Sequence, residues 1–76
     1  MEIQEFIENF ADQFDDTEVC DLNGETKFKE LEEWSSLIAL SVIAMVDEEY
    51  DVVIKGDDIR NSITIGDLFE AVKSKM

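Results

Sequence analysis

The chain has 76 residues and a mass of 8.7 kDa, enough for one small domain, and 45% of its residues are apolar. Twenty Asp and Glu oppose six Lys and Arg, so the formal charge is −14 and the pI is about 4.1. This balance argues against nucleic acid or an anionic membrane as a partner, because phosphate groups are bound by basic surfaces. It favours protein partners with basic surfaces.

Residues suited to catalysis are scarce. The chain has no histidine, and Cys20 is its one cysteine. A histidine-based zinc site, a Ser-His or Cys-His nucleophile pair and an internal disulfide are therefore excluded. Paired carboxylates need a cleft, which so small a domain rarely offers. We expect a protein that is not an enzyme, with a single domain over residues 1–76.

No targeting or membrane segment is predicted. Glu2 and Glu5 stand where a secretory signal carries basic residues. The most apolar stretch, Leu37–Val46, is far shorter than the roughly 20 residues that a membrane span needs. We expect a cytoplasmic monomer without stable membrane insertion.

The first predicted element is an amphipathic helix over Glu2–Phe14. Apolar side chains recur there at steps of three and four, which places them on one helical face: Ile3, Phe6, Ile7, Phe10 and Phe14.

A long polar connection over Asp15–Ser35 follows, with a turn signal at Asn23-Gly24. Phe28, Leu31 and Trp34 recur at every third residue, so we expect one helical turn that holds its aromatic rings against the core. Connections of this length are uncommon in compact domains and usually functional.

A second long helix is predicted over Ser35–Tyr50, with Ser35 or Ser36 as its N-cap. Its apolar residues cover more than one face, so the helix is either central or exposes apolar surface to a partner. The acidic run Asp47–Glu49 lies at its C-terminal end, where negative charge opposes the helix dipole. Such a local conflict often marks function.

The last third of the chain predicts a short and a longer helix. Val52–Ile54 is expected to be an extended segment, and a turn at Lys55–Asp58 leads into a helical turn through Arg60. Thr64-x-x-Asp67 resembles a capping box and opens the final helix, whose apolar side comprises Ile65, Leu68, Phe69 and Val72. The fold class is therefore all-α: three main helices plus one short helix, with a long first loop.

So many carboxylates are typical of calcium-binding proteins, whose EF-hand loops need acidic or amide ligands at fixed positions. With Gly24 at the sixth position of an EF-hand loop, Val19 falls on the first ligand position and has no ligand atom. Around Gly56, Val53 and Lys55 occupy ligand positions. No EF-hand is predicted, and a calcium-responsive binding protein stays as an alternative that calorimetry tests.

Trp34-Ser35-Ser36-Leu37 places hydroxyl groups at the start of the second helix. Backbone N–H groups and the positive end of the helix dipole stabilise a phosphate attached there. The chain offers no base to activate a serine, so another protein would perform the modification. On spacing alone, the simpler interpretation of both serines as capping residues is favoured.

Nearly the whole chain resembles the acyl carrier protein family, which has a helix, a long loop, an acidic helix opened by Ser-Leu, and two further helices. Ser36-Leu37 matches the Ser-Leu pair, and Asp47–Tyr50 matches the acidic-aromatic end of that helix. Phe28 and Leu31 are similar to the apolar anchors of the loop, and Ile63–Ile65 to the lead into the last helix.

The resemblance implies an acyl-carrier-like four-helix bundle in which Ser36 carries 4′-phosphopantetheine, attached by a phosphopantetheinyl transferase. Acyl groups would then be held as thioesters. It also implies that the second helix binds basic surfaces of acyl-loading and acyl-processing enzymes, through Leu37, Leu40, Asp47, Glu48 and Glu49. Family positions similar to Val42, Ile43, Val46 and Tyr50 border the cavity that shelters the acyl chain.

One departure stands beside the attachment serine: Ser35 replaces the Asp that the family usually has there. Ile38 and Ser41 likewise stand where many fatty-acid carriers have acids. The expected function is an acyl carrier for fatty-acid, polyketide or related biosynthesis. The alternatives are a peptidyl or aminoacyl carrier, and an unloaded protein-interaction module with the same fold.

Overall fold

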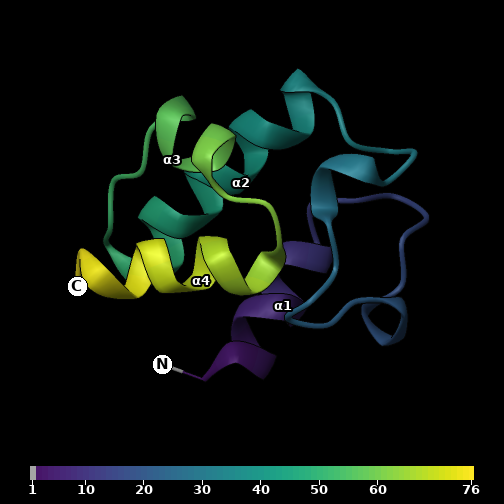
Figure 1. Ribbon diagram of the computed structural model, residues 1–76, viewed down its shortest axis with the longest axis horizontal. Coiled ribbons are helices and arrows are strands. Elements are labelled where there is room, and N and C mark those ends of the chain that lie inside the picture. The colour runs from purple at the N-terminus through teal and green to yellow at the C-terminus, as the bar shows by residue number, and fades with distance from the viewer. Residues whose placement is uncertain (1) are drawn as a thin grey trace.

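The computed structural model describes residues 2–76, and within that range it contains four α-helices and no strand. This confirms the predicted all-α bundle of three main helices and one short one. In Figure 1 the long connection between α1 and α2 occupies the right-hand side, and α3 lies above α4 on the left. In chain order the elements are α1 (Ile3–Ala11), the 3-10 turns η1 (Val19–Asp21) and η2 (Phe28–Glu30), α2 (Ser36–Tyr50), α3 (Gly56–Asn61) and α4 (Ile65–Ser74).

Helix α1 packs against α2 and α4 through the face that the sequence predicts. Phe6, Ile7, Phe10 and Phe14 are buried, whereas Ile3 in the first turn is exposed. The predicted extension of the helix to Phe14 is wrong, because the chain tightens after Ala11 into i→i+3 bonds, with the Phe14 N–H donating to the Ala11 carbonyl at 3.0 Å.

The long connection is held to the core by aromatic rings. Phe28 is fully buried, and Trp34 packs edge-on against it with ring centroids 4.9 Å apart. Phe28 also meets Phe10 of α1 at 5.6 Å. The predicted anchoring is therefore confirmed, although the connection contains two 3-10 turns rather than one helical turn.

Helix α2 is capped by Ser35 and buries Val42, Met45 and Val46. Near its end the Tyr50 hydroxyl accepts a hydrogen bond from the Asn9 side chain of α1 at 2.9 Å. Asp51 then adopts a left-handed conformation, with φ 56°, and ends the helix. Asp tolerates this conformation better than most residues do.

The segment after α2 is extended, as predicted: Val52 and Ile54 are buried, and Val53 between them points to solvent. Helix α3 begins at Gly56, inside the segment Lys55–Asp58 that was predicted to be a turn, and the Asp58 carboxylate accepts from the Lys55 backbone N–H at 2.9 Å.

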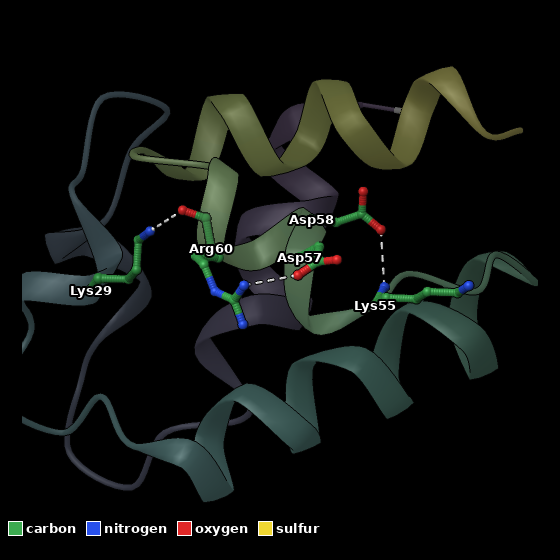
Figure 2. A network of polar contacts seen from close by, with 5 residues as sticks. All are labelled: Lys29, Lys55, Asp57, Asp58 and Arg60. Carbon is green, nitrogen blue, oxygen red and sulfur yellow. Dashed lines mark hydrogen bonds and ion pairs between the residues drawn. The ribbon is translucent and has the colours of Figure 1, made fainter.

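Figure 2 shows how α3 is tied to the long connection. The Lys29 ammonium donates to the Arg60 carbonyl at 2.8 Å, and the Arg60 guanidinium pairs with Asp57 at 3.0 Å. The second contact lies on the surface and contributes little to stability. The first joins η2 to the end of α3.

Helix α4 begins with the predicted capping box. Thr64 Oγ1 accepts from the Asp67 N–H at 3.1 Å, and the Asp67 carboxylate accepts from the N–H groups of Ile63 and Thr64 at 3.1 and 3.2 Å. These backbone hydrogen bonds hold the pKa of Asp67 below its ordinary value. The predicted apolar side is buried: Ile65, Leu68, Phe69 and Val72.

The start of α4 also rests on the long connection. The Ile65 N–H donates to the Thr26 carbonyl at 3.0 Å, and the Gly66 N–H donates to the Gly24 carbonyl at 2.8 Å. A Cβ on Gly66 would lie 2.7 Å from the Gly24 oxygen, so this approach requires glycine.

Within residues 2–76 every helix is too short or too polar to cross a bilayer.

Candidate functional site

The structure separates the roles of the two adjacent serines. Ser35 is the N-cap of α2, and its hydroxyl oxygen accepts from the Ile38 N–H at 3.3 Å. Ser36 is the first residue of the helix, and its side chain is exposed. No hydrogen bond joins the Ser36 hydroxyl to another group within residues 2–76. The choice between Ser35 and Ser36 as N-cap is thereby decided, and the Ser36 hydroxyl is left in solvent.

The surroundings of Ser36 suit an attached anion. The first turn of α2 contains no acidic residue. Its N-terminal backbone N–H groups lack partners within the helix and carry the positive end of the dipole of the longest helix in the described chain. Apart from the Ile38 N–H, which Ser35 engages, these donors remain available to a negative group on Ser36.

Four of the five predicted partner-binding residues share one exposed face with Ser36. Leu37 is 75% exposed and Leu40 is 62% exposed, and their spacing of three residues places these two apolar side chains next to each other on the helix surface. Steps of three and four residues continue this face to the acidic end of the helix. We call it the Ser36 face; it consists of Ser36, Leu37, Leu40, Ala44, Asp47 and Glu48.

Glu49, the fifth predicted residue, is exposed but does not belong to this face. It follows Asp47 by two residues, which corresponds to about 200° of helical rotation. Its side chain therefore leaves the helix on the side away from Asp47.

The residues expected to border an acyl cavity lie on the inner side of α2. Val42 and Val46 are fully buried, while Ile43 and Tyr50 are partly buried against the core. Burial raises the pKa of Tyr50, although the hydrogen bond from Asn9 opposes that shift.

Two surface hollows lie along the long connection. One runs from the end of α1 to η1 and is lined by Glu8, Asp12 and Glu18 among others. The other lies between Thr17, Asp21 and the segment at Glu32 and Glu33. Neither hollow includes Ser36. Within residues 2–76 no group of three or more acidic or cysteine side chains is arranged to hold a metal ion.

One residue near the site was missed by the sequence analysis. The Glu33 carboxylate accepts hydrogen bonds from the backbone N–H groups of Asp15 and Asp16 and from the Thr17 hydroxyl. These bonds lower the pKa of Glu33, the Thr17 hydroxyl contributing most. Nothing in the local pattern marks Glu33, because it is one of many acids in a polar segment.

No protein-family model matches the chain, and no curated protein has a significantly similar sequence. The function is therefore inferred from the residues and their geometry.

Proposed function

We propose that the chain is an acyl carrier protein and that Ser36 is the attachment residue for 4′-phosphopantetheine. The observation that carries the proposal is the exposed Ser36 hydroxyl at the first position of α2, beside a separate capping serine. Because Ser35 caps the helix, Ser36 can be modified without the loss of a capping bond. The phosphodiester of the arm would lie beside the free N–H groups of the first turn.

The order and lengths of the elements support the same proposal. A long connection between α1 and α2, a Ser-Leu pair at the start of α2, and a short α3 before α4 are features in which the chain resembles this family. Since the chain has no histidine, the base that deprotonates Ser36 is supplied by the transferase. Once attached, the flexible arm raises the effective concentration of its acyl group at successive active sites.

The charge distribution supports basic partners on the side of α2. The Ser36 face joins two exposed leucines near the attachment point to Asp47 and Glu48 at the far end. No cation lies between Lys29 and Lys55, so α2 contains none. This arrangement fits a partner enzyme that has an apolar contact surface for the two leucines and a basic patch for the two acids, separated by about the length of α2.

The decisive experiment is loading by phosphopantetheinyl transferases with coenzyme A, followed by intact-mass spectrometry. We expect the wild type to gain one phosphopantetheine mass and Ser36→Ala to gain none, with unchanged circular dichroism. Ser35→Ala is the matched control, since it removes the neighbouring hydroxyl and should still be loaded. Loading of Ser36→Ala but not of Ser35→Ala would show that the site assignment is wrong.

A chain that gains no mass with any of several transferases is instead an unloaded interaction module. The neutral Ser35 is the feature that favours this second candidate, because the family usually has Asp there. Ser35→Asp and Ser35→Asn both keep a good N-cap, but only the first adds charge. If a basic transferase surface recognises that charge, Ser35→Asp loads about three- to ten-fold faster than Ser35→Asn.

A further inference from the structure

The Glu33 carboxylate fastens the segment that precedes α2 to the beginning of the long connection. It accepts from the Asp15 N–H at 3.0 Å, from the Asp16 N–H at 3.0 and 3.1 Å, and from the Thr17 hydroxyl. We call these four residues the Glu33 clasp. Hydrogen bonds to an ionised carboxylate are about twice as strong as those between neutral groups. Lowering of the Glu33 pKa keeps the carboxylate in this form.

The next residue, Trp34, is held by the aromatic core. The Trp34 ring lies nearly parallel to that of Phe10, at an interplanar angle of 7°, and edge-on to Phe28. The Trp34 N–H donates to the Leu31 carbonyl at 3.0 Å. Glu33 and Trp34 together therefore fix the backbone immediately before the two serines.

The Ser36 side chain is exposed and is held by no hydrogen bond within residues 2–76. Its backbone belongs to the first turn of α2, where the Ala39 N–H donates to the Ser35 carbonyl at 2.9 Å and the Ile38 N–H donates to Ser35 Oγ at 3.3 Å. The direction in which the chain enters α2 is set by this first turn together with the residues just upstream. Among these upstream residues, Glu33 makes the hydrogen bonds that reach furthest along the chain, to residues 16–18 positions earlier.

We propose that Glu33 is a positioning residue for the modification of Ser36, acting through the Glu33 clasp. This inference rests on the proposed carrier function. Without the clasp, the segment from Leu31 to Ser35 samples more conformations, and a transferase must order that segment when it binds. Ordering this segment lowers the affinity of the transferase for the carrier. A variant without the clasp should therefore show a higher KM for the carrier at a similar kcat.

The test compares Glu33→Gln with Glu32→Gln. Both remove one negative charge from adjacent residues, but Glu32 makes no hydrogen bond within residues 2–76. We expect Glu33→Gln to lower kcat/KM for phosphopantetheine transfer about five-fold, mainly through KM, and Glu32→Gln to leave it near the wild-type value. Thr17→Val removes the hydroxyl donor and should lower kcat/KM, whereas Thr17→Ser keeps the hydroxyl and should preserve it.

A second measurement does not depend on loading. The ¹⁵N heteronuclear NOE of the Trp34, Ser35 and Ser36 amides should fall in Glu33→Gln but not in Glu32→Gln. Unchanged NOE values overturn the inference, and so does a lower thermal midpoint with an unchanged KM, which indicates a merely structural role. If the wild type takes up no phosphopantetheine, the proposed function and the role in modification both fail. The NOE comparison then still decides whether Glu33 orders the segment before α2.

Discussion

Helices α4 and α2 differ in how completely folding explains their sequences. Helix α4 has one buried apolar side, exposed polar residues on the other, a reciprocal capping box and Lys73 in its last turn. Helix α2 buries Val42 and Val46 on one side but also exposes Leu37 and Leu40 to water. Its last turn holds acids and no base. The residues of α4 are therefore those that the stability of the fold requires. The outer side of α2 has exposed apolar and acidic residues that folding does not require, and such a surface is typical of a binding site.

The largest predicted effect comes from the same substitution on the two helices. Leu68 of α4 is fully buried, so Leu68→Ala should cost about 2–5 kcal/mol in unfolding free energy. Leu40 of α2 is 62% exposed, so Leu40→Ala should stay within about 0.5 kcal/mol. Urea denaturation measures both, and Leu68→Met, which nearly conserves volume, should cost less than about 1.5 kcal/mol. Equal losses for the two alanine variants would contradict the contrast between the helices.

The second prediction concerns the close contact at the start of α4. Gly66→Ala places a Cβ 2.7 Å from the Gly24 oxygen and strains the hydrogen bond between these residues, so it should cost about 1–3 kcal/mol. Gly56 at the start of α3 has open space around it. Gly56→Ala should therefore be neutral or stabilising by about 0.4–1 kcal/mol, because it restricts the unfolded chain. The thermal midpoints of Gly66→Ala and Gly56→Ala should be compared. A loss in the first variant alone shows that the close approach of Gly66 to Gly24, and not an added Cβ atom in general, is responsible.

The third prediction compares the two N-caps. Thr64→Ala should lower stability by about 1 kcal/mol, since Thr64 accepts at 3.1 Å within a reciprocal box. Ser35→Ala should lower it by about 0.5 kcal/mol, since its single bond is 3.3 Å long. Ser36→Ala removes no hydrogen bond and should leave the urea midpoint unchanged. A larger loss for Ser36→Ala than for Ser35→Ala would indicate that Ser36 is the cap.

The smallest effect is a pH dependence at the cap of α4. The folded-state pKa of Asp67 lies below its ordinary value of 3.8, so the unfolded chain binds more protons as the pH falls. Asp67 therefore stabilises the fold above pH 3.8, and this contribution is lost as the pH falls through the lower folded-state value. The difference in urea midpoint between wild type and Asp67→Asn should accordingly shrink on acidification. Glu70→Gln, an exposed acid on the same helix without a hydrogen bond in the described chain, serves as the control.

Features that depend on residues close together in the sequence were predictable. The buried face of α1, the extent of α2 to within one residue and the capping box at Thr64 all follow from spacings of three or four residues. Such spacings act within one helix, where neighbours in sequence are neighbours in space. The anchoring of the loop by Phe28 followed for a related reason, because a large aromatic ring in a polar segment is stable only when it is buried.

The sequence by itself determined the helices, the acidity of the surface and the serine pair at the start of α2. Only the tertiary structure decided that Ser35 caps the helix while Ser36 is free, that Glu33 holds the residues at Asp15–Thr17, and that Gly24 meets Gly66. The Glu33 and glycine contacts join segments far apart in the chain, and no local periodicity encodes which segments meet. They form because burial of one shared core brings α1, the long connection and α4 together. Polar groups where these segments meet then form hydrogen bonds with one another.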